Sequence, residues 1–276
     1  MDFRQEWIIS EVAPTIEDLN NGRGCHLDEA ITLINYLEET ISAQSAAKAI
    51  TSAVLHEADP PGELYRVWRL LGHACEILDD QLEKLMNLLA AIQRLGPSDQ
   101  IDWSHLQGFK NVWNDLYGTL YEINLNSNEK RMFKNQEENF RNFFRTVGTA
   151  EAEMFVRNIG GFTELWGYEI LNLICSGRFG LEVYISHVHA WLEIAGPKLA
   201  ATFQPGQVKC FTRAVRGRPD KKYEMEVTMA EHWEHWKKTL LQVSHDEDFL
   251  SAEARQLAAE CYDMMKSQAI KMPWTE

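Results

Sequence analysis

Apolar residues recur at intervals of three and four over most of this 276-residue chain, and this spacing restricts the fold more than any other feature. The longest pattern extends over residues 64–95, where the apolar positions form a single helical stripe. The stretch HEADPPGE before it contains two prolines and a glycine, which interrupt helices, and the turn sequence GPSDQ follows it. The spacing predicts an all-α protein of about ten helices in antiparallel pairs.

Several shorter segments have the same helical spacing. Ser42 precedes an alanine-rich run and belongs to the residue types that cap helix N-termini. Pro197 is expected to end or bend the helix that contains it, because proline lacks a backbone N–H. Further helices are expected at residues 28–40, 106–123, 151–157, 164–174, 184–199, 229–243 and 251–268.

Residues 207–228 depart from the helical pattern. The alternation over residues 223–228 and the turn-like sequence GRPD predict a β-hairpin or a long mobile loop here. Since no low-complexity linker divides the chain, a single domain spanning residues 1–276 is expected. The predicted core consists of Ile34, Leu37, Trp68, Leu70, Leu82, Leu85, Phe109, Trp113, Leu116, Leu171, Trp191, Trp233, Trp236 and Leu257.

The composition is that of a globular protein, with 45% hydrophobic and 25% charged residues. A net charge of −14 opposes binding to nucleic acid and to anionic membranes. No run approaches the roughly 18 apolar residues of a membrane span, and the start MDFRQEWIIS lacks the features of a signal peptide. The five cysteines are odd in number and form no CxxC pair. We therefore expect a cytoplasmic protein with neither nucleic-acid nor membrane partners.

Several sequence segments are distinctive. They are SAQSAAKAIT at residues 42–51, LYRVWRLLGHAC at 64–75, HAWLEIAG at 189–196, HWEHWKKTL at 232–240 and EARQLAAECYDMM at 253–265. Together they resemble a large fungal family known only as domain of unknown function 3632. The resemblance implies a fungal, intracellular and mainly helical protein, and it transfers no catalytic residue.

Two acidic motifs indicate a candidate metal site. Asp79, Asp80 and Glu83 form a D-D-x-x-E sequence, and Asn114 and Glu122 belong to an N-D-x-x-G-x-x-x-E sequence. These motifs resemble the two magnesium-binding motifs of class I terpene cyclases. Carboxylate oxygens would hold Mg²⁺ ions that bind the diphosphate of a prenyl substrate.

The spacing of these motifs argues against that chemistry. Residues 80 and 114 are 34 positions apart, and the GPSDQ turn between them predicts an antiparallel helical hairpin. Packed helices lie about 8–10 Å apart, which is too close for several metal ions and a diphosphate. The acidic residues also lie opposite the leucine stripe, as expected of a solvated helix face.

Four histidines form a second candidate metal site. His232 and His235 lie near one helix face and could share a metal ion. His187 and His189 would point apart on a helix, so both can be ligands only if that segment is extended. The sequence HWEH is not the H-E-x-x-H motif of zinc proteases.

A basic segment lies within the predicted hairpin, against the acidic charge of the whole chain. It could bind an acidic partner, a phosphate or the protein's own acidic helices, or it could be a solvated hairpin end. Its members are Arg213, Arg216, Arg218, Lys221 and Lys222.

The sequence contains neither a nucleophile elbow nor a phosphate-binding loop in its usual strand–helix context. We therefore expect a non-catalytic interaction protein or a small-molecule-binding protein, whose partner is an unknown protein or small ligand. One alternative is a Mg²⁺-dependent enzyme acting on a prenyl diphosphate. Another is a cofactor-free enzyme with an aromatic pocket. No cofactor is expected except Mg²⁺ under the first alternative.

Overall fold

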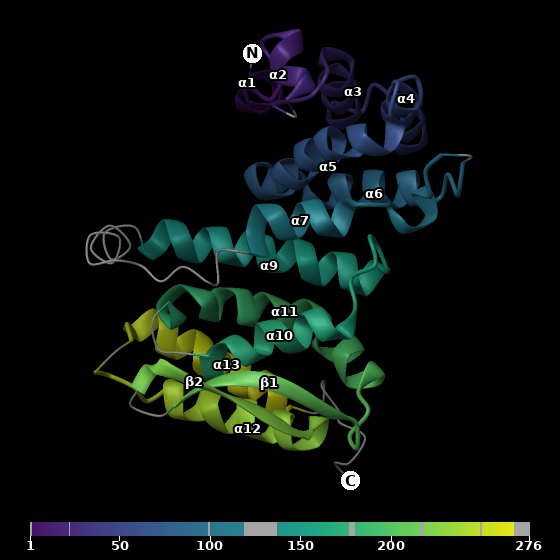
Figure 1. Cartoon of the computed structure of the whole chain (residues 1–276). Coiled ribbons are helices and arrows are strands. Elements are labelled where there is room, and N and C mark those ends of the chain that lie inside the picture. Colours follow the sequence, from purple (N-terminus) through teal and green to yellow (C-terminus); the bar gives the residue numbers. More distant parts are fainter. Residues whose placement is uncertain are drawn as a thin grey trace. The chain divides into compact units, whose positions relative to one another are not determined.

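The computed structural model describes residues 2–21, 23–98, 100–118, 137–176, 180–215, 218–248 and 250–267. This part of the chain contains twelve α-helices and one two-stranded hairpin (Figure 1), which confirms the all-α class with a small hairpin. Contacts group the chain into two compact units, of residues 1–124 with 158–162 and of residues 125–157 with 163–276. The single domain over residues 1–276 stays a prediction. Among the described helices, none combines the length and the apolar character needed to span a membrane.

The first unit consists of short and medium helices joined by tight turns. Its α-helices are α1 (Phe3–Ser10), α2 (Ile16–Asn20), α3 (Leu27–Leu37), α4 (Ala43–Leu55), α5 (Pro60–Ile77), α6 (Leu82–Gln93) and α7 (Phe109–Tyr117). Two single-turn 3₁₀ helices, η1 (Asp79–Gln81) and η2 (Trp103–His105), interrupt this series. Ser42 caps α4 as predicted, because its Oγ accepts a hydrogen bond from the Ser45 backbone N–H at 3.2 Å.

The apolar stripe of residues 64–95 is divided between two helices instead of forming one. The backbone at Leu78 leaves the helical region, with φ −110° and ψ 54°, and η1 follows it. Helix α5 packs against α7, whereas α6 packs mainly against α4. Leu78 is buried and Leu82 half-buried on either side of the break. The stripe stays in phase across the break, so its spacing alone could not locate the break.

Aromatic rings form the core of the first unit around α5 and α7. Trp68 meets Phe109 edge to face at a centroid distance of 5.5 Å, and Trp113 meets Tyr117 at 4.6 Å. The indole Nε1 of Trp68 donates to the Gln107 carbonyl at 2.7 Å, so this buried ring leaves no polar atom unsatisfied. The contact between Trp68 and Phe109 fixes α7 against α5, whereas Trp113 and Tyr117 contact each other within α7.

The second unit consists of longer helices and the hairpin. Its helices are α9 (Glu137–Arg157), α10 (Glu164–Ser176), α11 (Leu181–Thr202), α12 (Met229–Val243) and α13 (Ala252–Lys266), and its strands are β1 (Val208–Val215) and β2 (Arg218–Thr228). Helix α11 packs against α9, α10 and α13. It continues through Pro197 to Thr202, so the proline does not end the helix.

The hairpin confirms the strand alternative for residues 207–228. Strand β1 pairs antiparallel with β2, from Val208 opposite Thr228 to Val215 opposite Arg218. Thr228 ends β2 and also caps α12: its Oγ1 accepts from the Glu231 N–H, and Glu231 Oε2 accepts from the Thr228 N–H. This capping box fixes the angle at which the hairpin leads into α12.

Ten of the fourteen predicted core residues are buried, including all five predicted tryptophans. The other four, Ile34, Leu82, Leu116 and Leu257, are half-buried.

Helix α9 begins fourteen residues earlier than the segment 151–157 that the spacing predicts. Its Gly148 lies against His187, where a Cβ atom would approach the imidazole Cδ2 to 2.8 Å.

Candidate functional site

The acidic residues of the predicted magnesium site lie on three elements of the first unit. Asp79 and Asp80 are exposed on η1, Glu83 is exposed in the first turn of α6, and Asn114 is exposed on α7. Glu122 lies outside the described residues. Helix α7 packs against α5 and makes few contacts with α6, so the antiparallel hairpin expected of the two helices that flank GPSDQ does not form.

The exposed acidic residues take part in local contacts. Asp80 Oδ2 lies 3.2 Å from Arg4 Nη2 and accepts a hydrogen bond from Gln81 Nε2 at 2.7 Å. Glu83 Oε1 lies 3.4 Å from Asn87 Nδ2, one turn along α6. Among the described residues, no group of three or more His, Cys, Asp or Glu is placed to hold a metal ion. The magnesium site stays a prediction.

The histidines of α11 contact different helices. His187 Nε2 lies 2.7 Å from Glu151 Oε2 on α9, and the same oxygen accepts a hydrogen bond from Trp191 Nε1 at 3.1 Å. His189 Nε2 lies 3.0 Å from Glu260 Oε2 on α13. The two imidazoles therefore point apart, as predicted for positions i and i+2 of a helix.

His232, on α12, contacts a buried arginine. His232 is buried, and its Nε2 lies 3.0 Å from the Lys209 carbonyl, which can only accept a hydrogen bond. Its Nδ1 therefore carries the lone pair and accepts from Arg213 Nη2 at 2.6 Å. Burial, together with the charge of Arg213, lowers the pKa of His232, so this imidazole is neutral at pH 7.

The pKa of His235 is also lowered, and this shift predicts how the stability of the protein depends on pH. Burial, followed by the positive charge of Arg213, lowers this pKa from 6.5 to about 4. The unfolded chain therefore binds a proton between pH 6.5 and about 4 that the folded chain does not, so stability falls as the pH falls through this range. We expect a loss of about 2 kcal/mol after allowing for solvent screening.

Urea unfolding at pH 7 and at pH 4.5 measures this loss. The His235→Gln variant should lose about 2 kcal/mol less than the wild type on acidification. His245→Gln is the control, because His245 is exposed after the end of α12. Equal acid sensitivity of all three proteins would contradict the prediction.

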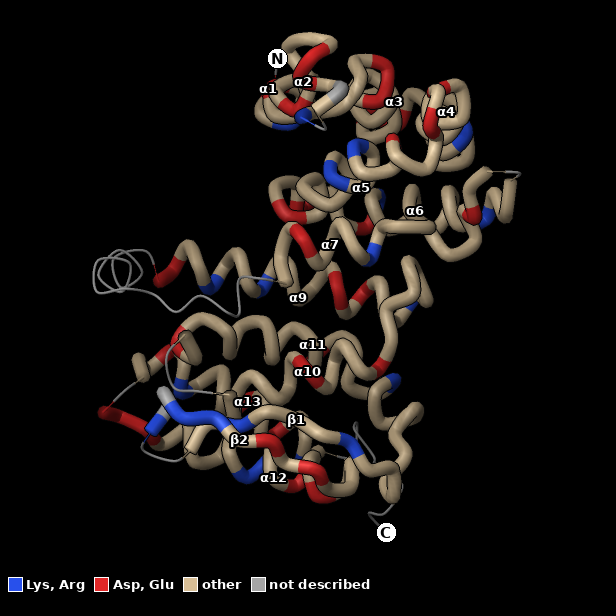
Figure 2. Tube along the Cα trace, viewed as in Figure 1, with Lys and Arg blue, Asp and Glu red and all other residues tan. Residues whose placement is uncertain are grey.

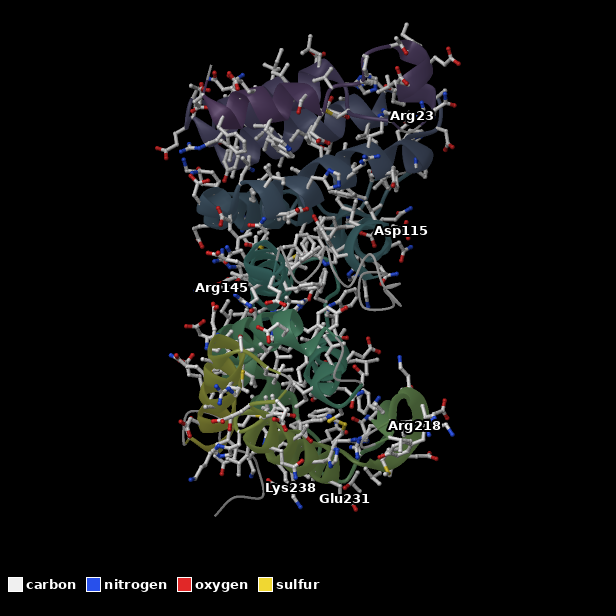
Figure 3. The ribbon with its side chains drawn as sticks, turned by 90° about the vertical axis from the view of Figure 1, so that its left-hand side faces the viewer. Arg23, Asp115, Arg145, Arg218, Glu231 and Lys238 are labelled. Carbon is white, nitrogen blue, oxygen red and sulfur yellow. The ribbon has the colours of Figure 1, made fainter. Side chains whose placement is uncertain are left out.

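The basic residues of the hairpin do not form one surface. Arg218, Lys221 and Lys222 are exposed, and Figure 3 shows Arg218 at the turn end of the hairpin. Figure 2 shows this basic end giving way to acidic residues along β2. Arg216 lies outside the described residues. Arg213 is buried, so the expectation of a wholly solvated basic end does not hold for it. Inward-facing positions alternate along a strand, and its position on β1 turns Arg213 toward α12.

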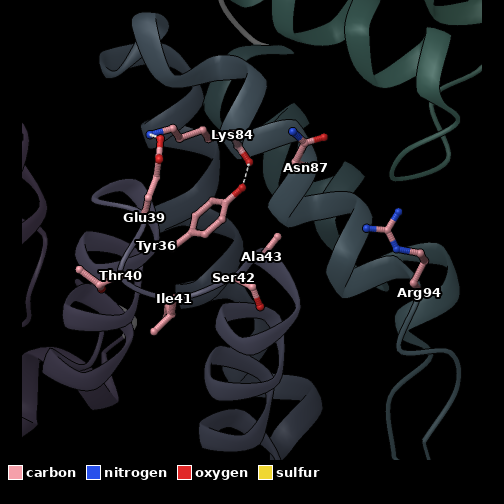
Figure 4. A pocket seen from close by; sticks show the side chains of 9 residues that line it. All are labelled: Tyr36, Glu39, Thr40, Ile41, Ser42, Ala43, Lys84, Asn87 and Arg94. Atoms are coloured by element: carbon pink, nitrogen blue, oxygen red, sulfur yellow. Dashed lines mark hydrogen bonds and ion pairs between the residues drawn. The ribbon is translucent and has the colours of Figure 1, made fainter.

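A pocket of about 600 Å³ lies in the first unit, between the turn that joins α3 to α4 and one face of α6 (Figure 4). Lys84, on α6, and Arg94, which directly follows α6, both line the pocket. Lys84 Nζ is 2.7 Å from Glu39 Oε1 and donates to the Leu37 carbonyl at 2.8 Å. The charge of Lys84 is therefore balanced by Glu39 and by the C-terminal end of α3.

The other part of the pocket has unbalanced positive charge. Arg94 is exposed, and no carboxylate lies within ion-pair distance of it in the described part of the chain. Ser42 and Ala43, at the N-terminus of α4, also line the pocket. The first N–H groups of a helix have no acceptor within it, and the first turn of α4 contains no acidic residue. Helix dipole and guanidinium thus favour an anion in the same pocket.

A third polar cluster in the first unit was not found from the sequence. His26 Nε2 lies 2.7 Å from Arg66 Nη2 and 3.0 Å from Glu57 Oε1. Arg66 also pairs with Glu63, and burial raises the pKa of the nearby Glu29. These residues come from the start of α3, the end of α4 and from α5, so helical periodicity gave no sign that they meet.

Comparison of the chain with protein-family models, with curated proteins and with solved structures finds no match. Membership of the fungal family therefore stays a prediction. The fold and the pocket define the protein as a mainly helical protein with a small hairpin and a positively charged pocket.

Proposed function

We propose that the protein binds a small anionic molecule, without transforming it, in the pocket between the α3–α4 turn and α6. The observation that carries this proposal is the position of Arg94 and the α4 N-terminus on one pocket. A guanidinium and free backbone N–H groups are suited to phosphate and carboxylate oxygens. A volume of about 600 Å³ fits a small organic molecule.

The polar face of α6 supports recognition of a ligand with more than one polar group. Lys84 and Arg94 lie near opposite ends of α6, and Asn87 lies between them on the pocket wall (Figure 4). The Tyr36 hydroxyl donates to the Lys84 carbonyl at 2.7 Å, and this contact holds α3 against α6 beneath the pocket. The wall is thus supported before any ligand arrives, which lowers the entropic cost of binding.

Thermal unfolding with phosphate or pyrophosphate at constant ionic strength tests the proposal. Both anions should raise the Tm without Mg²⁺, because binding to the folded state stabilises it. Arg94→Ala should weaken binding about 10- to 100-fold, since a hydrogen bond to a charged group contributes about 1.5–3 kcal/mol. Arg23→Ala is the matched control, because Arg23 is an exposed arginine of the same unit outside the pocket.

The same titration separates this proposal from the diphosphate-enzyme alternative. Stabilisation that requires Mg²⁺ together with pyrophosphate, and that disappears in Asp80→Ala, would support the metal-dependent enzyme instead. A Tm that no anion changes, or an Arg94→Ala variant that binds as tightly as the wild type, would refute anion binding in this pocket.

A further inference from the structure

Two arginines of the chain are equally buried but differ in their counter-charges. Arg66 and Arg213 are each 4% exposed, and each has a buried Nε without a hydrogen-bond partner. The guanidinium of Arg66 pairs with Glu57 and Glu63. No carboxylate among the described residues lies within ion-pair distance of Arg213. Arg66 follows the rule that buried charges are paired, and Arg213 departs from it.

The hydrogen bond that Arg213 makes does not compensate its charge. Its Nη2 donates to Nδ1 of His232, which is a neutral acceptor because Nε2 donates to the Lys209 carbonyl. The guanidinium can still donate further hydrogen bonds, since it carries five N–H groups. A full positive charge therefore lies beneath the hairpin, and its buried Nε–H has no hydrogen-bond partner.

The groups named as neighbours of this guanidinium are neutral or basic, and Glu231, which acts on His232, lies beyond ion-pair distance of Arg213. His235 lies one turn after His232 on α12, and it is half-buried, so its ring lies nearer the surface than Arg213. Cys175, near the end of α10, faces Thr239 at 3.7 Å and feels the charge of Arg213. Lys238, on α12, adds a further positive charge beside His235. Three elements thus enclose Arg213 without supplying a carboxylate.

We propose that Arg213 binds a small oxyanion between β1, α10 and α12, with His235 at the outer side of the site. The planar fork of an arginine matches phosphate and carboxylate oxygens, and a bound oxyanion would supply the counter-charge that the described residues lack. The ligand class is a phosphate, sulfate or carboxylate group, either free or at the end of a small molecule. This site belongs to the second unit and is independent of the α6 pocket.

Titration of the full-length protein with inorganic phosphate at constant ionic strength, followed by NMR of the histidine ring protons, tests this proposal. The His235 signals are assigned by their loss in His235→Gln. They should shift and saturate at millimolar phosphate in the wild type and in Arg94→Ala, which removes the guanidinium of the other pocket. Sulfate and acetate, titrated in the same way, distinguish an inorganic oxyanion from a carboxylate.

Two variants and a matched control make the test decisive. Arg213→Met should abolish the saturable shift, and Arg213→Lys, which keeps the charge but not the fork, should weaken it about tenfold. Arg66→Met should leave the His235 shift unchanged while lowering the Tm, because Glu57 and Glu63 lose their counter-charge. Absence of a saturable shift in the wild type, or the same shift in Arg213→Met, would overturn the proposal.

Discussion

Replacing Glu151 with alanine is expected to lower the free energy of unfolding by about 3–5 kcal/mol. The Glu151 side chain is 1% exposed, and one of its oxygens contacts both the His187 and the Trp191 ring nitrogens. The substitution removes this shared acceptor from a site that water does not reach. Two buried polar groups of α11 then lose their partner on α9, and that loss costs more than the pair itself contributes.

Chemical denaturation followed by far-UV circular dichroism measures this effect. Glu153→Ala is the matched control, because Glu153 lies on the same helix and pairs with Arg157 one turn away in a partly exposed position. That variant should lose less than about 1 kcal/mol. A similar stability of the two variants would show that the buried contact does not stabilise the α9–α11 pair.

Replacing Trp236 with alanine is expected to cost about 3–5 kcal/mol. The indole is completely buried in α12, and its ring lies 5.5 Å from that of Phe211 on β1 and 6.3 Å from that of Tyr168 on α10. Its Nε1 donates to Asn172 Oδ1 at 3.1 Å, while Asn172 Nδ2 donates to the Thr212 carbonyl at 2.6 Å. The indole therefore links α12, α10 and the hairpin, and its loss leaves both a cavity and an unsatisfied amide.

Trp236→Phe separates the two contributions. It retains most of the packing but removes the indole N–H, so we expect a loss of about 1–3 kcal/mol from the unpaired Asn172 oxygen. Hydrogen exchange at β1 amides should accelerate in both variants, and more in Trp236→Ala. Equal stability of the phenylalanine and alanine variants would contradict the packing role of the ring.

Most of the helices could be predicted from the sequence because apolar residues recur along them at helical spacing, whereas α1 and α2 were not predicted. Trp68, Trp113 and Trp236 lie in the core at the positions that helical spacing assigns to them. The break at Leu78 could not be predicted, since the stripe continues in phase and neither proline nor glycine marks it. Helices α5 and α6 are separate because they pack against different helices. Which helix each one packs against is set by the tertiary structure and cannot be predicted from local spacing.

Sequence spacing could not predict the polar clusters either, because their members are far apart in the chain. Glu151 and His187 are 36 positions apart, and Arg213 and His232 are 19 positions apart. Arg213 belongs to a basic run, which usually indicates a solvated surface. The alternation of β1 turns this one member inward, and that signal becomes visible only once the strand register is known. The pocket at Arg94 likewise forms from segments that have no common motif.

The hairpin has a consequence for the behaviour of the protein at high concentration. Because the described sheet contains two strands, each strand has one side that the other does not pair with. Such an edge can accept a strand from another molecule. Lys221, Lys222, Glu224 and Glu226 are all exposed along β2, and charged side chains on an edge oppose this pairing. The charges of the hairpin therefore help to keep the molecules apart.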